Sequence, residues 1–260
     1  MWGGRELNWK RDRCPVCGSL PAGDTVGSHN PKWVWDTCSS CGLYWIVELD
    51  PKQIPLFSTT DVEAHWELPD RPYDPKVQLI KNTLSGRRSP ERFDGHIHRI
   101  RSIDVNHGVL LDLGCGDGNM LQCIRKNMEW DRLVGIDFIS DLVLFAKQHW
   151  ELPDIHWLDI REGVPDDIKG QCDLVAMSDV LEHVMIPGDL LSAAVDCLVE
   201  GGKIWASFAD AASTPHFNPG EWQYWTDASI DHVCDKAGLK IIDASLAEAS
   251  CLKWCTMEVK

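Results

Sequence analysis

The sequence predicts an α/β fold, a mostly parallel sheet of seven strands with helices on both faces, preceded by a small cysteine-rich module. From Gly108 onward, short apolar runs alternate with amphipathic runs, which is the pattern of βαβ units around a parallel sheet. Before residue 51, two C-x2-C pairs stand among many turn-forming residues with little helical periodicity. With 260 residues, the chain is long enough for one substantial domain plus a small appendage.

These patterns divide the chain into three zones. Residues 1–50 form the cysteine-rich module, and residues 108–260 form the α/β domain. Residues 51–107 are rich in proline and charge, and we expect a helical linker or lid segment there, with helices at Lys76–Leu84 and Phe93–Asp104.

Hydrophobic periodicity places the individual elements of the α/β domain. Apolar runs predict strands at Val109–Leu113, Leu133–Asp137, Ile155–Leu158, Cys172–Met177, Lys203–Phe208, Leu239–Ala244 and Leu252–Val259. Amphipathic runs predict helices at Met120–Glu129, Asp141–Trp150, Asp189–Leu198 and Asp227–Ala237. We expect Ser140 to N-cap the second helix, Gly201-Gly202 to close the third, and Gly238 to stand at C′ of the fourth.

Composition and charge narrow the class of protein. The hydrophobic share of 44% and the charged share of 25% are ordinary for a soluble globular protein. No apolar run approaches the roughly 20 residues that span a bilayer, and the N-terminus has no apolar secretory region. We therefore expect a cytoplasmic protein with no membrane partner. The net charge of −15 lowers the expectation of a nucleic-acid partner without excluding one.

A glycine-rich loop, Asp112–Gly118, follows the first predicted strand and opens a helix. Glycines allow a tight turn and a close approach of ligand to backbone. The second strand ends in Asp137, 23 positions after Gly114, where nucleotide sites place an acid for the ribose hydroxyls. The third strand ends in Asp159, and the fourth runs into Ser178 at the carboxyl edge of the sheet. These features predict a nucleotide-like ligand site.

Two classes of ligand are candidates for this site. A nicotinamide dinucleotide site usually has its third glycine one position later, where this chain has Asn119. In contrast, LLDLGCGDG, VGIDFI, WLDI, CDLVAMSDVLEHV and VEGGKIWAS resemble the successive motifs of class I S-adenosylmethionine-dependent methyltransferases. The resemblance covers about residues 108–260 and is closest in character to the ubiquinone-biosynthesis and sugar methyltransferases. It implies a Rossmann-like fold with an antiparallel hairpin at one edge.

The resemblance also implies a set of cofactor-binding residues. The methionine part of the cofactor would lie by Asp112, Gly114, Cys115 and Gly116, with Ser178 near its end. Asp137 would bind the ribose, with Phe138 beside the adenine. Asp159 and Ile160 would frame the adenine, with Asp159 accepting a hydrogen bond from its amine.

The cysteine-rich module has the spacing of a zinc site, C-x2-C-x20-C-x2-C, formed by Cys14, Cys17, Cys38 and Cys41. Four cysteine ligands leave no open position, so the predicted Zn²⁺ is structural rather than catalytic. Free or disulfide-bonded thiols are the alternative, and the expected cytoplasmic location disfavours disulfides. Zinc ribbons precede some sugar methyltransferases and some ribosomal-RNA guanine methyltransferases, and the run Cys38–Trp45 is similar to the former.

The long segment Ala209–Thr226 is the predicted acceptor region, because long loops in compact domains are often functional. His216 is our first candidate for a general base and His183 the second, although the D-x-x-E-H pattern around Glu182 reads mainly as a fold element. Three aromatic residues either stack on an acceptor ring or sugar or pack the loop on the core: Trp222, Tyr224 and Trp225.

A basic stretch precedes the α/β domain and contains Lys76, Lys81, Arg87, Arg88, Arg92, Arg99 and Arg101, together with His96 and His98. It suits a diphosphate group or an RNA backbone, or it is a solvated helical face. The sequence thus predicts methyl transfer from S-adenosylmethionine to a small molecule, a sugar or natural-product intermediate. The alternatives are an RNA or protein methyltransferase whose ribbon holds the polymer, and a cofactor-binding scaffold without activity.

Overall fold

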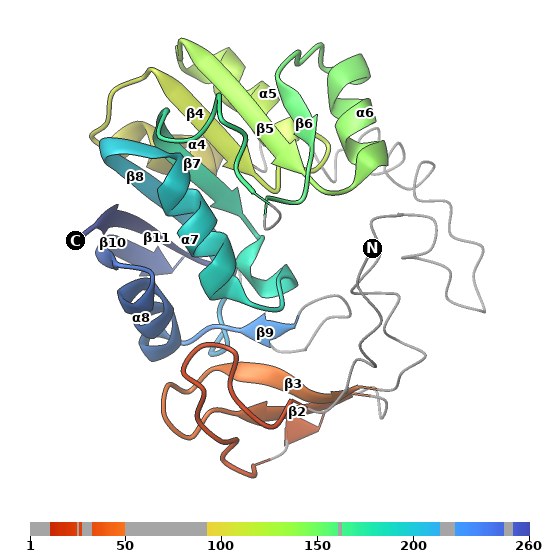
Figure 1. Cartoon of the computed structure of the whole chain (residues 1–260), viewed down its shortest axis with the longest axis vertical. Coiled ribbons are helices and arrows are strands. Elements are labelled where there is room, and N and C mark those ends of the chain that lie inside the picture. Colours follow the sequence, from red (N-terminus) through yellow and green to blue (C-terminus); the bar gives the residue numbers. More distant parts are fainter. Residues whose placement is uncertain are drawn as a thin grey trace.

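The structure is a computed structural model, and it describes residues 11–24, 26–27, 33–49, 93–160, 163–213, 222–246 and 252–260. Within those ranges the chain forms one large sheet with helices on both faces and one small sheet beside it (Figure 1). The predicted α/β fold class is therefore confirmed. The helix expected at Lys76–Leu84 lies outside the described residues.

The large sheet has seven strands in the order β10-β11-β8-β7-β4-β5-β6. Their bounds are β4 Val109–Leu113, β5 Arg132–Asp137, β6 Ile155–Trp157, β7 Cys172–Ser178, β8 Leu198–Ala209, β10 Leu239–Leu246 and β11 Leu252–Val259. Strand β11 is antiparallel to both β8 and β10, and the five strands from β8 to β6 are parallel. The strand order reverses between β4 and β7, which is where open α/β sheets bind ligands.

Helices cover both faces of this sheet: α4 Asp94–Ser102, α5 Asn119–Asn127, α6 Ser140–His149, α7 Pro187–Cys197 and α8 Asp227–Lys236. The buried side chains of α4, α5 and α6 share one apolar cluster, and those of α7 and α8 belong to another. In Figure 1, α7 and α8 lie in front of the sheet. The apolar stripes that the sequence predicts are thus the faces that the helices bury.

Two of the three predicted helix ends are wrong. Ser140 does not cap α6 but is its first residue, and the Asp137 carboxylate instead accepts a hydrogen bond from the Ile139 N–H. Gly201-Gly202 does not close α7, which ends at Cys197, because β8 already begins at Leu198 and runs through both glycines. Gly238 stands after α8 with φ of +73°, as predicted for C′.

The small sheet joins the cysteine-rich module to the α/β domain. It consists of β1 Val26–Gly27, β2 Trp33–Thr37, β3 Tyr44–Leu49 and β9 Gln223–Tyr224, all paired antiparallel. Its fourth strand, β9, comes from the segment between β8 and α8, so the sheet combines strands that are far apart in the sequence (Figure 1). Buried Leu43 and Trp45 of the module pack in the same cluster as Phe208 and Trp225. The module is therefore built into the domain.

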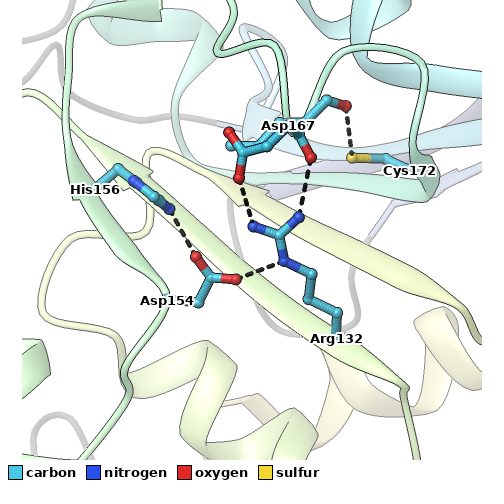
Figure 2. Close-up of polar contacts among 6 residues, drawn as sticks. Arg132, Asp154, His156, Asp167 and Cys172 are labelled. Carbon is cyan, nitrogen blue, oxygen red and sulfur yellow. Dashed lines mark hydrogen bonds and ion pairs between the residues drawn. The ribbon is translucent and has the colours of Figure 1, made fainter.

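An ion-pair network ties the first residues of β5 and β6 together at the amino edge of the large sheet (Figure 2). Arg132 donates to Asp154 at 2.6 Å and to the Asp167 carboxylate at 2.9 Å, and His156 contacts the second oxygen of Asp154 at 2.7 Å. Burial alone would raise the pKa of Asp154, but the hydrogen bonds from Arg132 and His156 hold it below its ordinary value. The network lies at the edge opposite the glycine loop, where it stabilises strand pairing.

In the described part of the chain, no helix combines the length and the apolar character that crossing a membrane requires.

Candidate functional site

The glycine loop lies at the carboxyl end of β4, with its backbone anchored to the next strand. The N–H groups of Gly114 and Cys115 both donate to the Ile136 carbonyl, at 2.8 and 3.1 Å. Gly114 has φ of +81°, and a Cβ there would lie 2.6 Å from Val180 Cγ2, so only glycine fits. At Gly116, with φ of +53°, a Cβ would meet only one atom within 4 Å, so the loop backbone is open there to a ligand.

Three buried carboxylates lie close together at this loop, two of them within it and one at the end of β5. Asp112, Asp117 and Asp137 are 1%, 5% and 7% exposed. The pKa of Asp112 is raised well above its ordinary value, first by burial and then by repulsion from Asp137 and Asp117. Its Oδ1 atom makes no hydrogen bond within the described residues. A buried acceptor beside two other acids favours a ligand that brings a positive charge and a hydrogen-bond donor.

Asp137 fastens the loop to the end of β5. Its Oδ2 accepts from the Gly116 N–H and its Oδ1 from the Ile139 N–H, both at 2.8 Å. Burial raises its pKa to about 6, although the hydrogen bonds from Ile139 and Gly116 act in the opposite direction. The carboxylate therefore lies between the glycine loop and the turn after β5. It is the residue for which we predict a ribose contact.

Two aromatic rings flank Asp137 at the edge of the sheet. Phe138 is 37% exposed and Trp157 is 63% exposed, and the Trp157 Nε1–H donates to the Phe138 carbonyl at 2.9 Å. Exposed ring surface suits a flat base. Our sequence reasoning named Phe138 but missed Trp157, whose position at the last residue of β6 was the available signal. Asp159 is half-buried beyond it, and Ile160 is buried in the core.

The adjoining ends of β7 and β8 carry a polar pair that the sequence analysis gave no role. Asp179 has φ of +56°, a conformation that residues other than glycine rarely adopt. The buried Ser207 hydroxyl donates to the Asp179 carboxylate at 2.8 Å, and its carbonyl accepts from the Asp179 N–H at 3.1 Å. Ser178, half-buried, precedes this turn. Strained residues cluster at functional sites, and this turn adjoins the glycine loop through Val180.

The predicted acceptor residues have different fates. His216 lies outside the described residues. His183 is exposed on the short 3-10 helix η4, Leu181–His183, which follows β7. The aromatic side chains of the acceptor segment are buried, and they pack the segment on the core and the module: Trp222, Tyr224 and Trp225. The ring centroids of Trp35 and Tyr224, for example, lie 5.3 Å apart. The structure thus shows these three rings packing the segment on the core, and not exposed for stacking on an acceptor.

The described part of the basic stretch is engaged in packing. The Arg99 guanidinium lies over the Trp254 ring, 4.1 Å from its centroid, and Arg101 donates to the Asn127 carbonyl at 2.9 Å. The His96 ring packs 5.1 Å from that of Trp205, whereas His98 is exposed. Both arginines thus hold α4 against the domain. The other five basic residues lie outside the described residues: Lys76, Lys81, Arg87, Arg88 and Arg92.

The four module cysteines meet at one point. One sulfur atom from each of Cys14, Cys17, Cys38 and Cys41 lies within 4.8 Å of the others, and none forms a disulfide. The Cys14 and Cys41 sulfurs are 3.7 Å apart, close to the roughly 3.8 Å expected in a tetrahedron of 2.3 Å zinc–sulfur bonds. The N–H groups of Ser40 and Cys41 both donate to Cys38 Sγ at 3.4 Å. The donor set fits a structural metal.

Comparison with known sequences matches residues 86–244, more than half of the chain, to a family described as methyltransferase domain. The chain is 26% identical over 162 residues to the mitochondrial ubiquinone biosynthesis O-methyltransferase of Candida albicans, covering 60% of this chain and 46% of that protein. It is 31% identical over 106 residues to the tRNA U34 carboxymethyltransferase of Pseudomonas savastanoi pv. phaseolicola, covering 39% and 33%. The chain thus spans less than half the length of these relatives.

Solved structures show the same fold. A S-adenosylmethionine-dependent methyltransferase from Clostridium acetobutylicum superposes with a TM-score of 0.57 at 12% identity, covering 71% of this chain and 97% of that one. One from Aquifex aeolicus gives 0.55 at 14% identity, covering 71% and 98%. The fold is that of the class I S-adenosylmethionine-dependent methyltransferases. The chain belongs to the methyltransferase domain family.

Proposed function

We propose that this chain transfers a methyl group from S-adenosylmethionine to a small-molecule acceptor, a sugar or other natural-product intermediate. The observation that carries the proposal is the buried Asp112 carboxylate at the start of the glycine loop, one oxygen of which makes no hydrogen bond within the described residues. The amino group of the cofactor would donate to that oxygen, and its positive charge would offset the repulsion among Asp112, Asp117 and Asp137. A nicotinamide dinucleotide, whose pyrophosphate is anionic, would add repulsion at the same place.

S-adenosylmethionine supplies a methyl group on a positively charged sulfur, so the transfer depends mainly on alignment. The proposed contacts at the methionine part are Asp112, the Gly114–Gly116 backbone with Cys115 between them, and Ser178. Asp137 would bind the ribose, and Phe138 would cover the adenine. Asp159 would accept from the adenine amine, with Ile160 behind it. A hydroxyl acceptor must also lose a proton, for which His216 and His183 remain our candidates.

Two observations support a small acceptor. The net charge of −15 opposes a polyanion on average. The module, moreover, is joined to the domain by strand pairing with β9, and the basic arginines of α4 that the structure describes are engaged within the domain. The curated relatives named for ubiquinone biosynthesis act, by their names, as O-methyltransferases. This supports an oxygen acceptor as the first class to assay.

We also propose that the four cysteines hold one structural Zn²⁺. Hydrogen bonding from the Cys41 thiol lowers the pKa of Cys14 below its ordinary value, so this sulfur is already disposed to be a thiolate. Coordination would relieve the repulsion of four sulfurs packed within 4.8 Å. Because all four positions of the tetrahedron are protein sulfurs, the metal would stabilise the module and take no part in the transfer.

An RNA methyltransferase is the second candidate, favoured by the likeness to a tRNA U34 carboxymethyltransferase. Calorimetry with S-adenosylmethionine tests the cofactor first. Absence of binding would exclude both a small-molecule methyltransferase and an RNA methyltransferase. Release of S-adenosylhomocysteine over a panel of phenolic, sugar and tRNA acceptors then separates them. The tRNA reading requires affinity for tRNA that falls steeply with salt. Binding of the cofactor without turnover on any acceptor would favour an inactive scaffold.

A further inference from the structure

The two described ends of the predicted acceptor segment, residues 209–211 and 222–225, are hydrogen-bonded to each other, and we call this pairing the loop neck. The Trp225 N–H donates to the Ala209 carbonyl at 3.0 Å, and the Ala211 N–H donates to the Trp225 carbonyl at 2.8 Å. This loop neck lies at the carboxyl end of β8, beside the end of β7.

Glu182 contacts both sides of the loop neck. Its Oε1 accepts from the Ala209 N–H at 3.2 Å, and its carbonyl accepts from the Trp222 N–H at 2.7 Å. The residue is 1% exposed. A carboxylate withdrawn so completely from water is costly unless hydrogen bonds satisfy it. The burial of this carboxylate therefore indicates that its hydrogen bond to Ala209 serves to hold the loop neck in place.

Gln223, on the loop neck, donates hydrogen bonds back to the turn that carries Glu182. Its side chain is fully buried, and its Nε2 donates to the Leu181 carbonyl at 2.7 Å and to the Val184 carbonyl at 2.9 Å. These carbonyls stand on either side of Glu182 in the chain. The turn that carries Glu182 and the strand that carries Gln223 are thus joined by hydrogen bonds in both directions.

The cysteine-rich module provides a second anchor for the loop neck. The Ile46 N–H donates to the Trp222 carbonyl at 3.1 Å, so the carbonyl and the N–H of Trp222 are held by the module and by Glu182 respectively. Further along, the Thr226 hydroxyl donates to the carbonyl of Cys41 at 3.1 Å. A member of the four-cysteine cluster is thereby in direct contact with the segment that follows the neck.

We propose that Glu182 is a positioning residue that fixes the loop neck, and that the module is its second anchor. The integrity of the four-cysteine site then controls the position of the loop neck while leaving the cofactor half of the site unchanged. That the neck borders an acceptor site rests on the proposed function, but the anchoring itself does not.

Hydrogen exchange measures the first anchor directly. In Glu182→Ala, we expect the amide of Ala209, which loses its acceptor, and those of Trp222 and Trp225 to exchange at least tenfold faster, with β4 and β5 unchanged. Glu182→Gln keeps an oxygen that accepts from Ala209 and should restore most of the protection, and the exposed Glu200→Ala is the matched control. An unchanged loop neck in Glu182→Ala, or exchange that rises equally across β4 and β5, would overturn the positioning role.

Opening the cysteine site tests the second anchor. Cys38→Ser, compared with Cys234→Ser outside the cluster, should accelerate exchange at Trp222 and Tyr224, with the S-adenosylmethionine Kd kept within about twofold. A disrupted module with a fully protected loop neck would contradict the proposal, as would collapse of the whole sheet. If the wild type binds no S-adenosylmethionine, the proposed function fails, whereas the exchange results still decide the anchoring.

Discussion

The Gly116 N–H donates to the Asp137 carboxylate at 2.8 Å, which links the glycine loop after β4 to the end of β5. One buried acid therefore sets both the shape of the loop and the position of the predicted ribose contact. Because the second oxygen of Asp137 holds the turn into α6 through Ile139, replacing this side chain affects three consecutive parts of the site.

Asp137→Ala should weaken S-adenosylmethionine binding by roughly 10- to 100-fold, since hydrogen bonds to a charged group contribute about 1.5–3 kcal/mol. Calorimetry gives the Kd directly. Asp196→Ala removes an exposed carboxylate on α7 and is the matched control. Equal affinity of the wild type and Asp137→Ala would show that the cofactor site is assigned to the wrong residues.

Asp137 also predicts a dependence of stability on pH. Its pKa is raised from 3.8 to about 6, mainly by burial and against hydrogen bonds from Ile139 and Gly116. Between pH 4 and pH 6 the folded state keeps a proton that the unfolded state has released. The free energy of unfolding therefore falls as the pH rises through this window, by about 3 kcal/mol from this group.

Urea unfolding at a series of pH values tests this sign. The wild type should lose stability relative to Asp137→Asn between pH 4 and pH 6, with no further divergence above pH 7. Cofactor affinity should change in the opposite direction, rising with pH, because the ionised carboxylate is the better acceptor for ribose hydroxyls. Parallel pH profiles for the two proteins would contradict the raised pKa.

Gly114→Ala should destabilise the protein more than Gly170→Ala does. Both glycines have positive φ, +81° and +66°, but only at Gly114 would the new Cβ clash, 2.6 Å from Val180 Cγ2. We expect about 1–2 kcal/mol of backbone strain at either site and about 1–3 kcal/mol more at Gly114. Chemical denaturation measures both, and adding Val180→Ala should relieve part of the excess. If the two glycine variants are equally stable, the close approach is absent.

Elemental analysis should find about one zinc per chain. Cys38→Ser should lose most of that metal. Cys234 lies on α8, in the hydrophobic core and outside the four-cysteine site, so Cys234→Ser should keep the metal. Chelation should lower the thermal midpoint of the wild type, because metal affinity contributes to folding when the site exists only in the folded state. Metal-free protein with unchanged thermal stability would exclude the structural role.

The sheet and the cofactor side of the site were predictable because their signals are local. Each strand is a short apolar run, and the acids at 112 and 137 stand at strand ends that a parallel sheet must bring to one edge. Helix ends were less predictable. Helix α6 begins at Ser140 itself and has no side-chain cap, and at Gly201-Gly202 the strand pairing of β8 prevailed over the tendency of glycine to end a helix.

The sequence by itself determined the fold class, the glycine loop with Asp112 and Asp137, and the four-cysteine spacing, because each depends on residues that are near in the chain or at fixed places in a sheet. Only the tertiary structure decided that the module is joined to the domain by strand pairing and that Trp222, Tyr224 and Trp225 are buried. The physical reason is that β9 pairs with β3 and that Glu182 accepts hydrogen bonds from the N–H groups of Ala209 and Trp222. These contacts join residues at least 27 positions apart, and no local pattern encodes them.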